Sequence, residues 1–136
     1  ILARFPELQV VSVEAGIGFI PFILEACDYT FDYGNVRRDN PEFTLKPSEY
    51  FARQVSACYI FEEFALRELM GAIGADNILF ETDYPHPVCL YGNVREKIDA
   101  ALGDAKPEER RKVLFENAAK LYKVAPPDVA PRMPVG

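Results

Sequence analysis

The chain has 136 residues, 49% of them apolar, and a formal net charge of −6 at pH 7. This length is enough for one domain with a hydrophobic core and leaves no room for two ordinary domains. The acidic balance, with a pI near 4.8, argues against nucleic acid or an anionic membrane as the main partner.

Cysteine content and hydropathy add two further expectations. The three cysteines are an odd number without the spacing of a metal-binding knuckle, which suits a reducing cytoplasm better than a disulfide framework. No apolar run of the sequence is long enough to span a bilayer. We therefore expect a cytoplasmic protein without a nucleic-acid or membrane partner.

The first third of the chain predicts a strand, a helix and a long loop. Residues 1–5 resemble the end of a helix, and residues 8–13, rich in β-branched side chains, predict a strand. Residues 32–46 are polar and aperiodic and predict a surface loop. Between them, residues 19–29 show helical periodicity, with an apolar face made of Phe19, Phe22, Ile23, Ala26 and Cys27.

The middle of the chain predicts a short helix, a second strand and a strong helix. Ser48 has the chemistry of an N-cap for a helix at 49–53. Residues 55–60 predict the second strand. Residues 62–73 carry apolar side chains at helical spacing, and Gly74 provides the stop.

The third strand is the short apolar run 78–80, and two helices follow it. Prolines two and four residues after Asp83 cannot continue a central ladder, so this strand must end near Thr82 or Asp83. Residues 94–102 and 107–122 predict helices. Residues 125–136 contain four prolines and predict a surface-draped or disordered tail.

The alternation of strands and helices predicts an α/β fold with parallel pairing and right-handed crossovers. Three strands alone would leave an unprotected sheet edge. The chain also begins at Ile1 without a methionine, already inside an amphipathic pattern. We therefore expect the sequence to be part of a longer protein.

Three polar side chains are candidates for chemistry at the strand ends. Asp83 follows a buried strand, where a carboxylate can bind a divalent metal or take a proton from metal-bound water; it could instead cap the next turn. Glu14 ends the first strand and could do acid–base work, or serve as a helix N-terminal charge or ion pair. His86, the only histidine, is a candidate ligand or base, although a lone loop histidine is more often a structural hydrogen-bonding group.

Residues 5–22, 74–86 and 116–122 resemble, in this order, the C-terminal part of the amidohydrolase-related metal-dependent hydrolases. This family of TIM-barrel proteins includes aminocarboxymuconate-semialdehyde decarboxylase and its relatives. The segment Thr82-Asp83-Tyr84-Pro85-His86 in its strand context is the most specific part of the resemblance. The resemblance implies that residues 1–124 are the C-terminal portion, about three β-α units, of a TIM (β/α)8 barrel, followed by the Pro-rich tail 125–136.

The resemblance also implies a metal site. Asp83 matches the family's aspartate on the final strand, which binds a catalytic divalent metal; zinc is the first expectation, with manganese and iron as alternatives. The other family ligands are histidines on earlier strands, upstream of Ile1. Glu14 stands where the decarboxylase relatives carry a catalytic histidine, which weakens a decarboxylase assignment because a carboxylate has a lower pKa and the opposite charge.

These observations give three functional expectations. The first is a metal-dependent hydrolase of a small organic carboxylate or amide-like substrate, with Asp83, Glu14 and His86 in the site. The second is a non-oxidative decarboxylase of the same family. The third, from another class, is an inert α/β fragment or interaction domain. A small-molecule substrate is the expected partner, and a homodimer is an expectation by family analogy alone.

Overall fold

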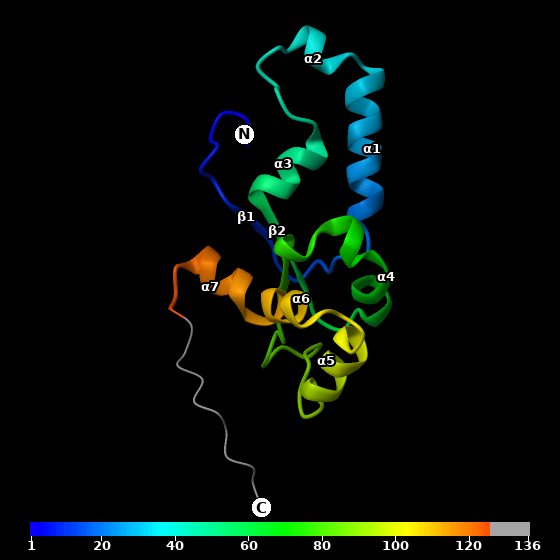
Figure 1. The fold of residues 1–136 in the computed structure, drawn as a ribbon, viewed down its shortest axis with the longest axis vertical. Helices are drawn as coiled ribbons and strands as arrows, with labels where there is room; N and C mark the ends of the chain where they lie inside the picture. The colour runs from blue at the N-terminus through cyan, green and yellow to red at the C-terminus, as the bar shows by residue number, and fades with distance from the viewer. Residues whose placement is uncertain (126–136) are drawn as a thin grey trace, which may run out of the picture.

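Three parallel strands form the centre of the fold in the computed structural model, which describes residues 1–125 (Figure 1). The strands are β1 (Val10–Ser12), β2 (Val55–Tyr59) and β3 (Ile78–Phe80), and they lie in the order β1-β2-β3. Val10 pairs with Val55, and Ala57 with Ile78. The predicted α/β alternation with parallel pairing is therefore confirmed.

The strands alternate with helices, several of them short. The helical elements are α1 (Ile20–Tyr33), α2 (Val36–Asp39), α3 (Pro47–Gln54), α4 (Glu63–Ile73), the 3₁₀ turn η1 (Ala75–Asn77), α5 (Val94–Leu102), α6 (Pro107–Arg111), the π-helical turn η2 (Lys112–Glu116) and α7 (Asn117–Tyr122). Gly74 ends α4 at φ 97°, as its position predicted. No helix within residues 1–125 has the length and apolar character needed to cross a bilayer. Residues 126–136, most of the predicted tail, lie outside the described residues.

Several local predictions were wrong. Residues 1–5 form a turn closed on the Ile1 carbonyl, not a helix end. The predicted loop 32–46 contains the last two residues of α1 and the whole of α2. Helix α3 begins at Pro47, so Ser48 is not its N-cap; instead the Ser48 hydroxyl donates to the Asp28 carboxylate at 2.6 Å.

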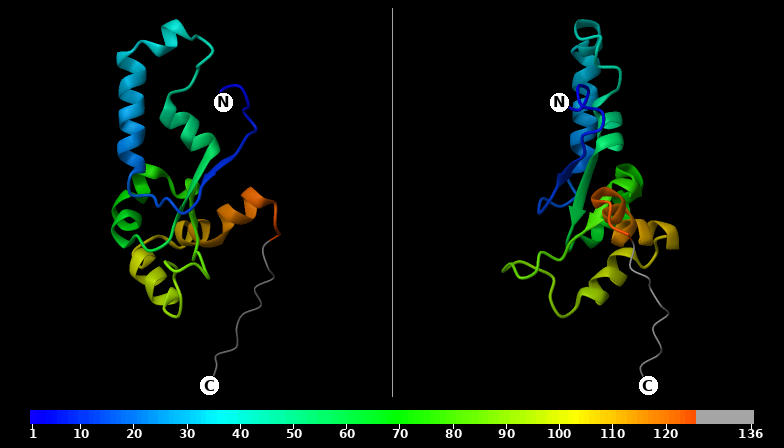
Figure 2. Two further views of the ribbon diagram at one scale, coloured as in Figure 1. Left: turned by 180° about the vertical axis from the view of Figure 1, so that it is seen from behind. Right: turned by 90° about the vertical axis from the view of Figure 1, so that its left-hand side faces the viewer.

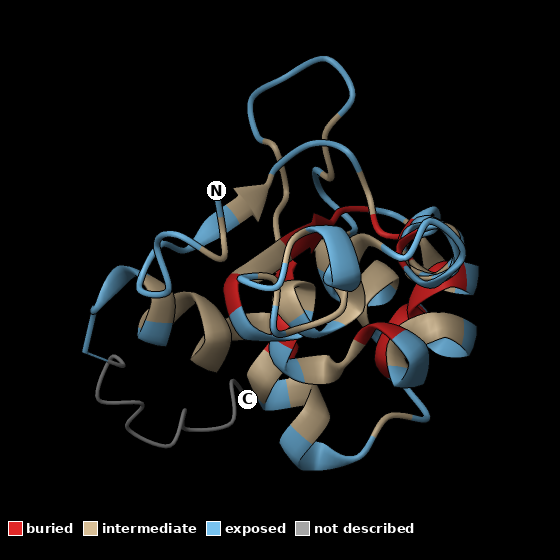
Figure 3. Cartoon of the chain, turned by 90° about the horizontal axis from the view of Figure 1, so that it is seen from above, coloured by how far each residue is buried: buried red, intermediate tan, exposed pale blue. Residues whose placement is uncertain are grey.

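The hydrophobic core lies between the sheet and the helices that follow each strand. Leu66 of α4, Leu102 of α5 and Val113 of η2 are each at most 1% exposed. They pack with strand side chains in a cluster of Ile17, Ile20, Ala57, Tyr59, Ala65, Leu66, Ile73, Ile78, Ala101, Leu102 and Val113. Figure 3 shows these buried segments gathered around the strands. Because side chains alternate along a strand, the neighbours of these core residues, such as Cys58 and Leu79, lie on the opposite face of the sheet.

Helices α1, α2 and α3 form an arm that projects from the sheet (Figures 1 and 2). Helix α1 has 14 residues and so extends about 21 Å, much farther than β1. Two contacts join it to the segment that returns to β2: Ser48 with Asp28, and Lys46 with Asp32 at 2.6 Å. The arm is thus a helical hairpin between β1 and β2.

The face of α1 predicted to be apolar is not the face that packs. Phe22 is 71% exposed and Phe19 47% exposed, and Cys27 is also exposed. The buried side chains of α1 are instead Ile20 and Phe31. Periodicity located an apolar stripe on this helix correctly, but it could not say which side the rest of the described chain covers.

Candidate active site

The carboxyl ends of three parallel strands meet at one edge of the sheet, and each is followed by an acidic side chain. Glu14 follows β1, Glu62 follows β2, and Asp83 follows β3. In α/β barrels this edge is where catalytic side chains gather. The structure therefore places Glu14 and Asp83 at the same edge, as the sequence predicted, and adds Glu62 between them.

Asp83 sits in a turn just past β3, with its backbone in the left-handed region at φ 57°. Its side chain is only 18% exposed, and Nδ1 of His86 lies 3.1 Å from its Oδ2. The backbone N–H of His86 also donates to the Asp83 carbonyl at 2.8 Å. The structure thus brings Asp83 and His86 together as a pair, with the carboxylate inside and the imidazole, 56% exposed, outside.

Glu14 also adopts the left-handed region, at φ 59°. Its backbone N–H donates to Oε1 of Glu81 at 2.8 Å, although the two residues are 67 positions apart. The Glu14 side chain is exposed. A non-glycine residue in this region is uncommon and costs free energy, so it persists only where the surroundings hold it.

Glu62 holds the turn that follows Glu14. Its Oε1 accepts the backbone N–H groups of Ile17 at 2.7 Å and Gly18 at 3.1 Å. Gly16 lies at φ 71° directly against this carboxylate, and a Cβ at Gly16 would be 2.6 Å from Oε1. The other oxygen, Oε2, is buried and has no hydrogen-bond partner among residues 1–125.

Glu81 extends the sheet past β3, because its N–H donates to the Tyr59 carbonyl at 3.1 Å. Cys58 pairs with Leu79 across the ladder, so Glu81, two residues farther on, lies on the same face as the Cys58 thiol. Burial raises the pKa of that thiol to about 12, and the charge of Glu81 and a hydrogen bond with it act in the same direction. Cys58 therefore stays a neutral thiol beside Glu81.

Sequence reasoning missed both Glu62 and Glu81. Their partners are backbone groups 44 to 67 residues away, and no local pattern indicates those contacts. The available signal was their position at strand ends, together with Gly16, whose conformation requires glycine because a side chain would meet Glu62.

The residues present fit one part of a metal site. Asp83 offers a hard oxygen donor with little exposure, and His86 offers an imidazole beside it. Within residues 1–125, however, no group of three or more His, Cys, Asp or Glu side chains is arranged to hold an ion. Zinc takes four ligands, so Asp83 could supply one ligand, and residues 1–125 do not by themselves supply a complete set.

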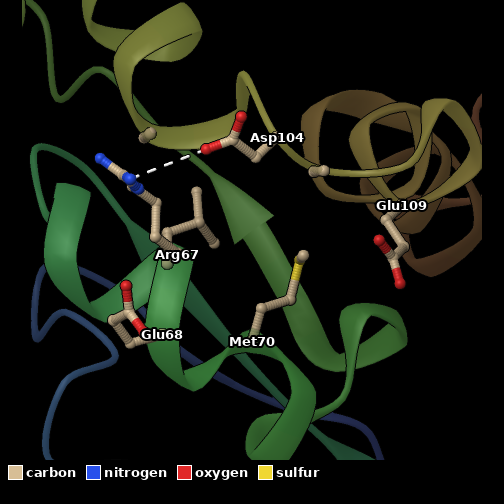
Figure 4. Close-up of a pocket in the computed structure, with 8 residues that line it drawn as sticks. Arg67, Glu68, Met70, Asp104 and Glu109 are labelled. Atoms are coloured by element: carbon tan, nitrogen blue, oxygen red, sulfur yellow. Dashed lines mark ion pairs between the residues drawn. The ribbon is translucent and has the colours of Figure 1, made fainter.

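A separate hollow of about 190 Å³ lies on the helical side of the sheet, between α4 and the segment from α5 to α6 (Figure 4). Arg67 and Asp104 form an ion pair at its mouth, 3.7 Å apart, and both are largely exposed. Neither Glu14, Asp83 nor His86 lines it. This hollow is therefore not part of the strand-end edge.

Comparison with known proteins identifies the family. The sequence profile of the amidohydrolases matches residues 1–124. The chain belongs to the amidohydrolase family. The chain is also similar in structure to two solved proteins. One is 5-carboxyvanillate decarboxylase from Sphingomonas paucimobilis, with 29% sequence identity and a TM-score of 0.72. The other is an amidohydrolase from Mycobacterium avium subsp. paratuberculosis, with 28% identity and a TM-score of 0.72.

The chain covers only part of these amidohydrolases. It is matched over 91% and 88% of its own length but spans 36% and 29% of theirs. A 5-carboxyvanillate decarboxylase from Novosphingobium aromaticivorans, with bound manganese and 3-methoxy-4-hydroxy-5-nitrobenzoic acid, is 21% identical at a TM-score of 0.64, with 90% and 35% coverage, and shows the fold alone. These neighbours are TIM barrels, so the sheet is a C-terminal portion of a (β/α)8 barrel, as predicted.

Proposed function

We propose that the protein containing this chain is a metal-dependent enzyme that acts on a small organic carboxylate, with Asp83 as one ligand of its divalent metal. One observation carries the proposal. The Asp83 carboxylate is 18% exposed at the carboxyl end of a barrel strand and is paired with His86. Within residues 1–125, His86 is the side chain that pairs with this carboxylate, and this edge is where barrel enzymes place their chemistry.

Each side chain at the edge has a role in this proposal. Asp83 supplies an oxygen ligand, and His86 orients its carboxylate through the 3.1 Å contact with Oδ2. A divalent metal, when bound, polarises a substrate oxygen and lowers the pKa of a bound water. Glu14, exposed at the neighbouring strand end, gives or takes a proton on the substrate. Zinc is the first candidate ion, and manganese and iron are the alternatives.

Two reactions fit this arrangement. Decarboxylation is supported by the 29% identity, over 91% of the chain, with a 5-carboxyvanillate decarboxylase; in that reaction Glu14 would deliver the proton that replaces the departing carboxylate. Hydrolysis is supported by the membership of the amidohydrolase family and by a carboxylate at Glu14, which suits proton transfer to a leaving group. A small organic carboxylate is the substrate of the proposed decarboxylation. It is also one of the two substrate classes expected for the hydrolysis, the other being amide-like compounds.

The test is Asp83→Ala in the full-length protein, with Asp104→Ala as the matched control. Asp104 is 90% exposed and lies away from the strand ends. Metal content is measured by elemental mass spectrometry. Activity is measured as carbon dioxide release from 5-carboxyvanillate and as hydrolysis of a panel of small amides and esters. We expect Asp83→Ala to lose bound metal and to lower activity by at least about 100-fold, with the control unchanged.

The outcomes separate the functional classes. Carbon dioxide release that depends on Asp83 selects the decarboxylase, and amide or ester cleavage that depends on Asp83 selects the hydrolase. Unchanged metal stoichiometry and activity after Asp83→Ala would overturn the assignment of this ligand. A full-length protein with neither metal nor activity would support the inert interaction domain instead.

A further inference from the structure

Glu14 is held in place from a distant strand. The Glu81 carboxylate, at the end of β3, accepts the Glu14 backbone N–H at the end of β1 at 2.8 Å. Strand β2 lies between these two strands. The Glu81 side chain therefore spans the width of β2 and joins the two outer strands at the strand-end edge.

This contact acts on a residue in an unfavourable backbone conformation. Glu14 is left-handed at φ 59°, and only the surrounding structure can maintain that conformation in a residue with a Cβ. The direction of the Glu14 side chain depends on this φ angle. A change of the backbone from the left-handed to the extended region would send the carboxyl group elsewhere.

The turn after Glu14 is fixed separately. Glu62 accepts the N–H groups of Ile17 and Gly18 and so anchors the far end of the turn. Glu81 provides the hydrogen bond at the near end, at Glu14 itself. The two carboxylates thus act at opposite ends of residues 14–18, and Glu81 alone contacts the residue proposed to move a proton.

Glu81 also links Glu14 to the proposed metal ligand. It lies two residues before Asp83 on the same chain segment, and its own N–H is fixed to the Tyr59 carbonyl at 3.1 Å. A shift of the end of β3 would therefore move Asp83 and the support of Glu14 together. The two groups keep their relative position because one short segment controls both.

We propose that Glu81 is a positioning residue, which fixes the Glu14 carboxyl relative to Asp83 through the Glu14 backbone N–H. The proposal rests on the proposed function for its catalytic consequence, but its structural part does not. Glu81 itself touches neither substrate nor metal in this assignment. Its required chemistry is an acceptor oxygen at the end of a side chain of this length, which glutamine also supplies.

The first test follows the structure directly, by hydrogen exchange of the peptide that contains residues 13–18 in the full-length protein. Glu81→Ala removes the acceptor, and Glu81→Gln keeps an acceptor oxygen. We expect exchange at this peptide to be at least about 10-fold faster in Glu81→Ala and close to wild type in Glu81→Gln, because an amide that loses its hydrogen bond opens more often. Equal exchange in wild type and Glu81→Ala would overturn the proposal.

The second test is kinetic and uses a double-mutant cycle with Glu14→Gln. We expect Glu81→Ala to lower kcat by about 10- to 100-fold with KM and metal content little changed, and Glu81→Gln to restore most of kcat. In the Glu14→Gln background, Glu81→Ala should have no further effect on kcat, because Glu81 acts through Glu14. A purely structural role would lower activity equally in both backgrounds.

The outcomes distinguish this inference from the proposed function. Loss of activity in Glu14→Gln with an additive cycle would overturn the role of Glu81 and leave the proposed function standing. Full activity in Glu14→Gln would remove Glu14 from the mechanism, and the hydrogen-exchange result alone would then decide whether Glu81 holds residue 14. Loss of metal in both Glu81 variants would make Glu81 a ligand and would also overturn the proposal.

Discussion

Replacing Gly16 by alanine tests the carboxylate support of the strand-end turn. Gly16 lies at φ 71°, and an added Cβ would be 2.6 Å from Oε1 of Glu62. The far end of a glutamate side chain can move, but this one can leave only by giving up the N–H groups of Ile17 and Gly18. Gly92 is the matched control, because it has φ 81° and open space where its Cβ would lie.

The expected loss of stability can be built from two terms. Both substitutions put alanine in the left-handed region, which costs about 1–2 kcal/mol. Gly16→Ala also removes two hydrogen bonds to a charged acceptor. Each contributes about 1.5–3 kcal/mol when it is shielded from solvent, and less when it is exposed. One of the two is exposed to solvent, so we expect Gly16→Ala to cost about 2–4 kcal/mol more than Gly92→Ala.

The assay is urea unfolding of the full-length protein, with the free energy of unfolding compared between the two variants and wild type. If Glu14 has its proposed role, Gly16→Ala should also lower activity, because the turn that it disturbs begins at Glu14. If Gly16→Ala costs no more than Gly92→Ala, the Glu62 carboxylate does not hold this turn.

Two further predictions concern the core and the thiols. Leu66→Ala should lower the free energy of unfolding by about 2–5 kcal/mol, because Leu66 is 0% exposed. Leu69→Ala should lower it by less, because Leu69 is only partly buried. Equal losses of the two variants in urea unfolding would contradict this order. Iodoacetamide at pH 8 should modify the exposed Cys27 and spare Cys58, whose thiol pKa burial raises to about 12. Peptide mass spectrometry measures the modification of each cysteine. Modification of Cys58 in the folded protein at the same rate as Cys27 would contradict the burial of the Cys58 thiol.

The elements that local sequence determines were predicted closely. The helix predicted at 62–73 is α4 (Glu63–Ile73), because its apolar spacing and Gly74 both act within a few residues. The apolar run predicted as a strand at 78–80 is β3, although β3 ends at Phe80, before Thr82 and Asp83, where the prolines had placed its end. The first strand was overestimated: only Val10–Ser12 of residues 8–13 pair with β2, since the length of a ladder depends on the partner strand.

The candidate site was predicted only in outline. The positions of Glu14 and Asp83 at strand ends followed from the strand prediction, and the contact between Asp83 and His86 is consistent with their three-residue spacing. The left-handed conformations and the supporting carboxylates of Glu62 and Glu81 depend on contacts that join separate strands. No local pattern contains that information, because it exists only after the strands have paired.

The tip of the helical arm is a suitable place to attach a label to this protein. Helix α1 starts at the strand-end edge and carries α2 about 21 Å away from it, and α2 itself buries no side chain. A fluorophore, an affinity tag or a few inserted residues at 37–41 would therefore sit far from Glu14 and Asp83. Labels at this tip can report on immobilisation, diffusion or orientation of the protein and lie apart from the strand-end edge.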